Sequence, residues 1–600
     1  MNSVQARALS FGIQPEYEGM GGTMHTAPRE TLEALLDVLG GNAAPSAPVH
    51  ELRAPEGVRC YLPPDAPRVW GVAVQLYQLR SGRNWGIGDF ADLERLAEIL
   101  GAAGADFIGL NPLHALFLSD PSLRSPFSPS NRRFLNPLYL AVDRMTGFRP
   151  DMVAPQTLAD LREAELVDYP AVTAVKMQVL RQLWAEAGSP DAPQSFHHQD
   201  REDLERHAVF EALSETMVER GHGAGWQCWP PQYRDVNSPA VAEFARTDQS
   251  ACVFHRWLQY EADRQLNAAR TACHAAGMGI GLYLDFAVGE AAGGSGSWGD
   301  RDVMSSVRIG APPDYFNENG QDWGLAPLSP LRMADSRAAP YQALMQGATE
   351  RAGALRIDHA MGLWQLFLIP DGAGPAEGTY VRYPIAHMLR ALADASHANK
   401  TIVIGEDLGN VPPGFRDVMA EAGILSYRIF MFERNEDGFI PPEDYPPLAL
   451  ACLSTHDLPT FQGWWMGDDI RLRASFGFIS DAAAHDQSTA RETERAELLQ
   501  DLKKGGLLAE DDVPATATQA APEAVVAAVH RHLARTPSLL FAARLEDMVG
   551  ETKPVNVPST LDEYPNWRLK LGTTLEDIGN VPLFQSIARG LRKERPKAGG

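Results

Sequence analysis

The chain has 600 residues, 44% of them hydrophobic, and its 53 basic and 77 acidic side chains give a formal net charge of −24. The apolar fraction is that of a globular protein and excludes a disordered chain. The acidic excess repels phosphate backbones and anionic lipid, so we expect neither nucleic acid nor a membrane as partner, and a neutral substrate fits better.

Cysteine usage and the N-terminal residues indicate the compartment. The five Cys are scattered and form no CxxC pair, which argues against a disulfide framework, a zinc ribbon and a redox dithiol. The first residues lack the apolar core of a signal peptide, and no run approaches the ~18 apolar residues of a membrane helix. We therefore expect a reduced, cytoplasmic protein.

The chain opens with a short lead-in, residues 1–66. Leu residues at helical spacing over 31–39 end at a Gly pair, and the Pro-containing stretch LPPDAPR at 62–68 marks a boundary. We expect the main unit over 67–575 and a C-terminal helix and tail at 576–600.

Eight short apolar runs follow the boundary. They span 69–79, 106–113, 279–288, 353–360, 401–408, 424–432, 448–457 and 537–547. Near-continuous apolar runs are typical of strands buried on both faces. Helical patterns at 92–104, 252–277 and 385–400 alternate with them, and such alternation indicates a parallel sheet. Eight units predict an α/β fold, a closed (β/α)₈ TIM barrel.

The spacing between the runs is uneven. Long insertions interrupt the units at about 141–250, 289–350 and 465–535. In this architecture the loops at the C-terminal ends of the strands build and cover the active site. We therefore expect inserted subdomains around the C-terminal face of the barrel.

Three acidic residues stand at the ends of three separate runs: Asp358 in LRIDH, Glu406 in VIGED and Asp457 in STHD. A barrel would bring all three into one mouth. Retaining glycoside chemistry uses one carboxylate as nucleophile and one as acid and then base, and a third can stabilise the positively charged transition state. A single acid at a strand end more often caps the next helix, but three in this pattern favour catalysis.

Basic residues lie beside these acids. Arg356 is two residues before Asp358 and points to the same side of the strand. This spacing predicts an ion pair that keeps Asp358 charged, and the alternative is a purely structural pair in the barrel interior. His359 and His456 are candidates for binding substrate hydroxyls, or else histidines of the core or of a helix cap.

Aromatic side chains concentrate in the loops after the runs, where they would stack on the apolar faces of sugar rings. They are Trp298, Tyr315, Phe316, Trp323, Trp364, Trp464 and Trp465. Each could fill the core instead, but the polar, Gly-rich surroundings at 311–324 favour exposed platforms. The sequence holds no P-loop, HExxH or GxSxG motif, so we expect neither a cofactor nor a metal.

Longer motifs resemble those of a known family. The segments are QLYQLRSGRNWGIGDFADL (75–93), NPLHALF (111–117), SPFSPSNRRFLNPLYL (125–140), GLYLDFAVGEAAGGSGSW (281–298), GAPPDYFNENGQDWG (310–324), LRIDHAMGLWQLFLIP (355–370), IGEDLGNVPP (404–413), STHDLPT (454–460) and VNVPSTLDEYPNWRLKL (555–571). Over about 70–575 they are similar to amylomaltase, the 4-α-glucanotransferase or disproportionating enzyme of glycoside hydrolase family 77 in the α-amylase clan.

The resemblance implies a role for each matching residue. Asp358 would be the nucleophile on barrel strand four, Glu406 the acid/base on strand five and Asp457 the stabiliser on strand seven. The glucan subsites would be lined by Arg356, His456, Asp314, Tyr315, Trp323, Ser125 and Phe127. The predicted substrate-binding set is completed by His359, Phe316, Trp298 and Asp285. The residues after Asp285 depart from the clan pattern, which has Asn-His there, so a structural role is its alternative. The family implies no cofactor.

The expected activity is that of a retaining 4-α-glucanotransferase. It would cleave an α-1,4 glucan, hold the glycosyl part on Asp358 and pass it to the 4-OH of another glucan. Its partners would be maltodextrins and glucans derived from glycogen or starch. The alternative is a hydrolase with the same acids, which differs in how well its acceptor subsites exclude water. A non-catalytic glucan-binding protein would not need all three acids.

Overall fold

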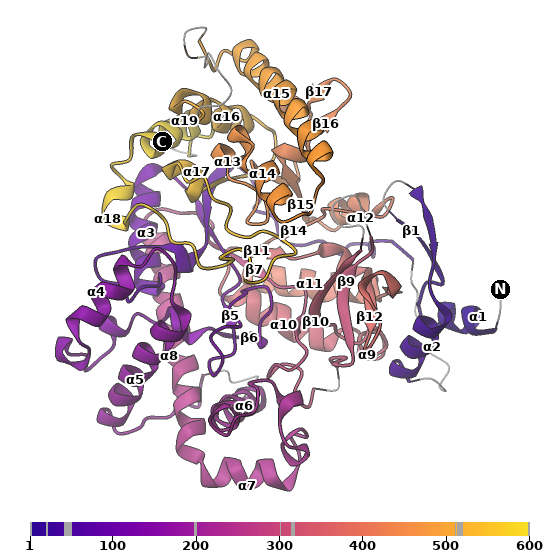
Figure 1. The fold of residues 1–600 in the computed structure, drawn as a ribbon, viewed down its shortest axis with the longest axis vertical. Helices are drawn as coiled ribbons and strands as arrows, with labels where there is room; N and C mark the ends of the chain where they lie inside the picture. The colour runs from indigo at the N-terminus through magenta and orange to yellow at the C-terminus, as the bar shows by residue number, and fades with distance from the viewer. Residues whose placement is uncertain are drawn as a thin grey trace.

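Eight parallel strands close into a barrel at the centre of the molecule (Figure 1). In sheet order they are β11 (Ala354–Ile357), β14 (Ile402–Gly405), β15 (Leu425–Ile429), β18 (Ala449–Cys452), β19 (Leu540–Arg544), β3 (Val69–Val74), β4 (Phe107–Leu110) and β7 (Gly281–Phe286). Each strand falls within one of the eight apolar runs, so the predicted (β/α)₈ barrel is confirmed. The computed structural model describes residues 3–19, 22–40, 51–65, 67–196, 201–300, 302–313, 319–509, 512 and 520–597.

Large apolar side chains fill the barrel interior. One buried cluster joins Phe107, Tyr283, Ala354, Ile402, Ile404, Leu425, Tyr427, Ile429, Leu450, Cys452, Leu540 and Ala542, at least one residue from each of seven barrel strands. The interior is therefore a packed core rather than a channel, and substrate can reach only the loops at its ends.

Helices form the outer layer of the barrel. They are α3 (Phe90–Ala103), α8 (Gln249–Ala275), α10 (Ala339–Glu350), α11 (Ile385–Asn399), α12 (Phe415–Glu421), α16 (Glu523–Ala534) and α19 (Pro582–Glu594). The first illustrates why they start and stop where they do. The Asp89 carboxylate accepts hydrogen bonds from the backbone N–H groups of Ala91 and Asp92, and Gly104 ends the helix with φ +96°, a conformation that glycine adopts readily.

The first insertion, between β4 and β7, is mainly helical. It holds β5 (His114–Ala115), β6 (Asn131–Leu135), α4 (Pro155–Glu163), α5 (Tyr169–Glu186), α6 (Arg201–Glu219) and α7 (Pro239–Thr247). Figure 1 shows α6 and α7 projecting from the barrel on the side away from α15 (Asp481–Lys504). The long helix α8 ties this insertion to the barrel, because it packs against both α6 and α3.

The second insertion contributes to a separate five-stranded antiparallel sheet. Its strand order is β13 (Thr379–Arg382), β12 (Gln365–Pro370), β9 (Val307–Ala311), β10 (Gln321–Ala326) and β8 (Glu290–Ala291). Strands β12 and β13 come from the segment after β11, so two successive barrel loops meet in one sheet. Helix α9 (Pro330–Asp335) leads from this sheet to α10.

The third insertion lies between β18 and β19. It contains α13 (Phe461–Met466), α14 (Asp468–Ser475) and α15, and α15 packs against α14 and α16. The short strands β16 (Arg434–Asn435) and β17 (Gly438–Phe439) lie beside α15 (Figure 1). The remaining short helices are α17 (Leu545–Val549) and α18 (Leu575–Ile578), both after the last barrel strand. The domain limits drawn from the sequence stay predictions.

The N-terminal residues pack on the edge of the five-stranded sheet. They form α1 (Ser3–Ser10), β1 (Glu16–Glu18), β2 (Met24–Thr26) and α2 (Arg29–Val38). Ile13 bridges Val381 of β13, and the rings of Tyr17, Phe367 and Tyr380 contact one another at 5.4 to 5.6 Å between centroids. The described part of the lead-in is thus attached to the main unit.

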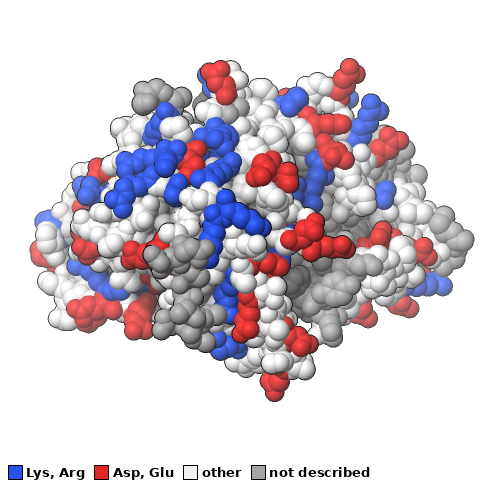
Figure 2. Space-filling model, turned by 90° about the horizontal axis from the view of Figure 1, so that it is seen from above, with Lys and Arg blue, Asp and Glu red and all other residues white. Residues whose placement is uncertain are grey.

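The surface carries its charge unevenly. Figure 2 shows Lys and Arg side chains gathered on one part of the face it presents, with acidic side chains interspersed, although the whole chain has a net charge of −24. Among the described residues, no helix combines the length and the apolar character needed to span a bilayer.

Candidate active site

The register of the barrel places Asp358 and Glu406 side by side. Ile357, the last residue of β11, pairs with Gly405, the last residue of β14, and the two acids are the next residues along. The Glu406 N–H donates to the Ile357 carbonyl at 3.0 Å, and the Asp358 N–H donates to the Phe286 carbonyl of β7 at 3.0 Å. Adjacent strands lie about 4.8 Å apart. Both carboxyl groups therefore start from neighbouring positions at the C-terminal mouth.

Arg356 connects three carboxylates in this mouth. Its Nη1 lies 2.8 Å from Asp285 Oδ1 and 2.9 Å from Asp358 Oδ1, and its Nη2 lies 3.9 Å from Glu406 Oε2. Only 8% of the Arg356 side chain is exposed, and its Cζ lies over the Tyr427 ring, 5.6 Å from the centroid. The expected pair with Asp358 is present, and the same guanidinium also faces both other carboxyl groups.

Asp285 meets Arg356 because the two are register partners on β7 and β11. Both oxygens of Asp285 accept from Arg356 Nη1, at 2.8 and 3.0 Å. Burial raises the pKa of Asp285 to about 6, against the opposing effect of Arg356. This buried ion pair is the arrangement that the alternative, structural role of Asp285 predicts.

Two backbone amides hold Glu406. The His359 N–H donates to Oε2 at 2.9 Å, and the Leu408 N–H donates to Oε1 at 2.8 Å. His359 has a left-handed backbone with φ +48°, an uncommon conformation for a residue other than glycine. Burial raises the pKa of Glu406 to about 7; Arg356 and the two amides oppose this rise, and the Asp358 charge adds to it. Glu406 is therefore suited to exchange protons near neutral pH.

Asp457 lies in the loop between β18 and α13. Its Oδ1 accepts from Asn556 Nδ2 at 2.7 Å, and its Oδ2 lies 3.2 Å from His456 Nε2. The Asp457 side chain is 46% exposed, in contrast to 10% for Glu406. Desolvation acts to raise the pKa of Asp457, but the His456 charge and hydrogen bond, with Asn556, lower it to about 2. Asp457 is therefore a stable anion at neutral pH.

An aromatic wall borders the carboxylates. The His456 ring stacks on Phe127 with 4.4 Å between centroids, and Trp567 lies 5.5 Å from Phe127 and 5.6 Å from His456. Phe127 also faces Arg356, whose Cζ is 5.9 Å from the ring centroid. Ser125 belongs to the same turn, since its carbonyl accepts from the Ser128 N–H. The barrel thus brings Arg356 of β11 together with residues from the loops that follow β4, β18 and β19.

Trp323 approaches from the five-stranded sheet. It is half-buried on β10, and its ring meets the His359 ring edge-on with 5.2 Å between centroids. Burial lowers the pKa of His359 to about 4. The imidazole is therefore neutral at pH 7 and presents one donor and one acceptor beside the mouth.

The prediction of exposed platforms is wrong for four tryptophans. Trp298 is 0% exposed, Trp364 8%, Trp464 4% and Trp465 1%. Trp298 packs against Phe210 and Trp229, and its Nε1 donates to the Tyr233 carbonyl at 3.1 Å. It closes the core of the helical insertion, where apolar contacts bury the whole indole, so it offers no surface to a sugar. Asp314, Tyr315 and Phe316 lie outside the described residues.

Three residues of the mouth were not among the predicted ones: Tyr427, Asn556 and Trp567. Tyr427 belongs to the sixth apolar run, where the sequence predicts a ring buried in the core. Asn556 and Trp567 lie in the loop after the last barrel strand, within VNVPSTLDEYPNWRLKL. Their position after a barrel strand is the signal that could have found them.

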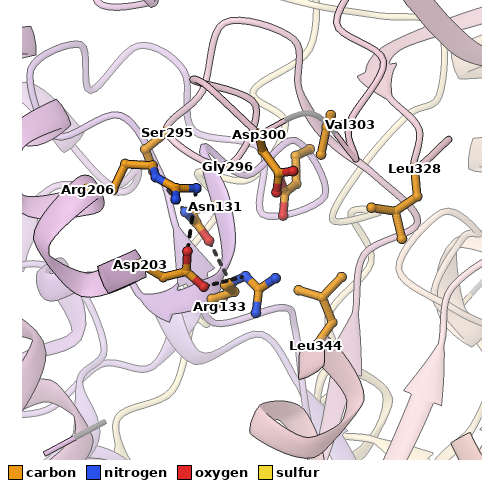
Figure 3. Close-up of a pocket in the computed structure, with 11 residues that line it drawn as sticks. Asn131, Arg133, Asp203, Arg206, Ser295, Gly296, Asp300, Val303, Leu328 and Leu344 are labelled. Carbon is orange, nitrogen blue, oxygen red and sulfur yellow. Dashed lines mark hydrogen bonds and ion pairs between the residues drawn. The ribbon is translucent and has the colours of Figure 1, made fainter. Parts of the chain in front are cut away.

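A separate pocket lies beside the helical insertion (Figure 3). In it Asp203 pairs with Arg206 at 3.5 Å and with Arg133 at 3.6 Å. The pocket is also lined by Asn131, Glu290, Ser295, Gly296, Asp300, Val303, Leu328 and Leu344. Asp358, Glu406 and Asp457 do not line it, so it is distinct from the barrel mouth. In the described part of the chain, no group of three or more His, Cys, Asp or Glu residues could hold a metal ion.

Comparison with known proteins decides the family. The family model described as 4-alpha-glucanotransferase matches residues 74–574. The chain belongs to this family. The enzyme is 38% identical over 554 residues to the 4-alpha-glucanotransferase of Mycobacterium tuberculosis, covering 88% of this chain and 75% of that protein. It is 34% identical over 545 residues to the 4-alpha-glucanotransferase of Haemophilus influenzae, covering 85% of this chain and 76% of that protein.

A solved structure agrees with this assignment. The amylomaltase from Corynebacterium glutamicum is 27% identical to the enzyme and superposes with a TM-score of 0.85, over 98% of this chain and 99% of that chain. The family expected from the motifs is thus confirmed, and with it the class of enzyme.

Proposed function

We propose that the enzyme works by a retaining mechanism in which Asp358 carries a covalent glycosyl group. The observation that supports this most directly is the Arg356–Asp358 ion pair at 2.9 Å beside Glu406, whose pKa is about 7. A strand spacing of about 4.8 Å also fits the separation of about 5–5.5 Å between the carboxyl groups of retaining enzymes, and not the wider gap of inverting ones.

In the first step a carboxylate oxygen of Asp358 attacks the anomeric carbon of an α-1,4 glucan. The bond from that carbon to the glycosidic oxygen breaks, and protonated Glu406 gives its proton to the departing oxygen. The fragment with the new 4-OH leaves. The donor part remains as a β-linked ester on Asp358, and Glu406 is now a carboxylate.

In the second step the 4-OH of another glucan enters. Glu406 takes the hydroxyl proton, the oxygen attacks the anomeric carbon, and the bond to Asp358 breaks. Two inversions restore the α-linkage. The amides of His359 and Leu408 hold the Glu406 carboxylate during this step, since each donates to one of its oxygens at 2.9 and 2.8 Å.

Asp457 is proposed to stabilise the charge that develops on the sugar ring in both steps. It is an anion at neutral pH, because His456 and Asn556 hold its pKa low. A fixed negative charge next to an oxocarbenium-like ring lowers the free energy of the transition state more than that of the neutral ground state.

The proposed substrates are maltodextrins and glucans derived from glycogen or starch. Phe127 and His456, which are partly exposed and packed against the buried Trp567, form an aromatic wall on which the C–H faces of glucose units would pack. The half-buried Trp323 beside His359 would offer a further ring. An apolar acceptor site that holds sugar and excludes water favours transfer over hydrolysis.

Products formed from maltotriose test the proposal. We expect glucose together with chains longer than maltotriose, resolved by chromatography, and no products from an Asp358→Asn variant. If only glucose and maltose form, water is the acceptor and the enzyme is a hydrolase with the same acids.

A further inference from the structure

Asp457 is held differently from the two other acids. Asp358 and Glu406 each follow the last residue of a barrel strand, and strand register fixes their backbone. Asp457 lies further out, in the loop between Cys452 at the end of β18 and Phe461 at the start of α13. Its half-exposed carboxylate therefore takes its position from the path of that loop.

Arg544, the last residue of β19, donates hydrogen bonds to this loop. Its Nη1 donates to Ser454 Oγ at 2.9 Å and to the Thr455 carbonyl at 2.7 Å. The same nitrogen lies 3.3 Å from the Leu458 carbonyl and 3.5 Å from the Pro459 carbonyl. Arg544 is 4% exposed, so its guanidinium sits inside the turn that carries His456 and Asp457. One buried cation thus gathers acceptors from both sides of Asp457.

The residues after Arg544 complete the attachment. Its Nη2 lies 3.5 Å from Glu546 Oε1, which is a buried countercharge. Asp547 Oδ1 accepts from the Phe461 N–H at 2.7 Å, and the Thr460 side chain caps the same helix by accepting from the Gly463 N–H. The segment 544–547 therefore fixes both the loop and the helix that follows it.

We propose that Arg544 is a positioning residue that places Asp457 against the reacting sugar. The inference rests on the proposed role of Asp457. In the described part of the chain no hydrogen bond or ion pair joins Arg544 to Asp457, so Arg544 would act through the loop backbone. Without the guanidinium the loop carbonyls lose their shared donor, and Asp457 moves relative to a mouth whose other parts stay in place. The proposed transition-state contact weakens, while the aromatic wall still binds glucan.

The chain offers a matched control in Arg595. This arginine is 2% exposed and donates to the carbonyls of Ala534, Val69, Leu539 and Thr536 at 2.8 to 3.2 Å. Val69 opens β3 and Leu539 precedes β19, so these contacts lie at the opposite end of the barrel from Arg544. Arg595→Met removes the same kind of buried carbonyl clamp without touching the mouth.

A double-mutant cycle tests the proposal. The variants are Arg544→Met, Asp457→Asn and their combination, with Arg544→Lys and Arg595→Met alongside, assayed with a maltotriosyl fluoride donor and with maltotriose. We expect Arg544→Met to lower kcat about 100-fold, since displacement by about 1 Å costs this much, with KM changed less than about threefold. Arg544→Lys keeps a charged donor and should lose less. In the Asp457→Asn background Arg544→Met should add less than about a threefold loss.

Four results would overturn the inference. The first is a full loss from Arg544→Met in the Asp457→Asn background, and the second is an equal loss of kcat in Arg595→Met. If Arg544→Met does not fold, judged by circular dichroism, Arg544→Lys replaces it in the double-mutant cycle. The third result is that the losses of kcat from Arg544→Lys and Asp457→Asn are additive. If Asp457→Asn leaves kcat unchanged, the proposed stabiliser is wrong, and the positioning role falls with it. If Asp457→Asn is impaired and the effects add, only the positioning role falls.

Discussion

The guanidinium of Arg356 lies 2.9 Å from the carboxylate of Asp358, two residues further along the same strand end. Alternate residues of a strand share one side, so this pairing follows from local geometry. The orientation of the guanidinium does not, because Asp285 on the neighbouring strand fixes it with two further contacts. The proposed nucleophile is thus held by a side chain that is itself held from another strand.

Trapping the intermediate checks the assignment of the two main acids. In a Glu406→Gln variant the proton donor is lost, so transfer from natural glucans should fall severely, by about 100-fold or more. A glycosyl fluoride needs no protonation of its leaving group and should still load Asp358. The ester should then accumulate, because no base remains to activate the acceptor, and mass spectrometry should find it on the peptide containing Asp358.

The matched control is Asp358→Asn, which should give no labelled peptide from the same fluoride. A label on Glu406 or Asp457 instead would contradict the assignment of nucleophile and acid, whatever the family.

The pH dependence should reflect the proton on Glu406. Because its pKa is about 7, the protonated fraction falls as pH rises above 7, and kcat/KM for maltotriose should fall with it by about tenfold per unit. The rate of the glycosylation step with a fluoride donor should not show this decrease at high pH. If the same decrease in kcat/KM at high pH persists in Glu406→Gln, the proton belongs to a different group.

Asn556→Ala should weaken the proposed stabiliser without removing it. The lost hydrogen bond reaches a charged oxygen at 2.7 Å, and such bonds contribute about 1.5–3 kcal/mol. We expect kcat to fall at least about tenfold, with a smaller change in KM. Asn267→Ala is the control, since Asn267 Nδ2 donates to Asp263 Oδ2 at 2.9 Å on the outer helix α8. Equal losses in the two variants would remove the link to Asp457.

Trp298 and Trp323 should respond in opposite ways to substitution by Ala. Trp298 is wholly buried, so Trp298→Ala should lower the free energy of unfolding by about 3–5 kcal/mol and lower Tm, with KM little changed in the folded fraction. Trp323 is half-buried beside His359, so Trp323→Ala should raise KM for maltodextrins with a small change in Tm. Thermal unfolding and initial rates measure both, and a raised KM with unchanged Tm in Trp298→Ala would contradict its structural role.

The sequence by itself was enough to predict the barrel. A strand that is buried on both faces has a continuous apolar run as its sequence, and such a run can be recognised from neighbouring residues alone. The eight runs therefore located all eight strands. The placement of Asp358 and Glu406 is local in the same sense, because each acid stands at the end of its own run and a parallel barrel gathers strand ends at one face.

Only the tertiary structure decided which distant side chains meet. Asp285 reaches Arg356 through the register of β7 against β11. Asn556 reaches Asp457 across 99 residues of sequence, and Arg544 reaches Ser454 across 90. Asn556, Asp457 and Ser454 lie in loops that have no periodic pattern, so the paths of these loops depend on closure of the barrel and on the side chains that pack against them. The burial of Trp298 has the same origin: an indole in a Gly-rich loop reads as exposed until Phe210 and Trp229 of the helical insertion fold over it.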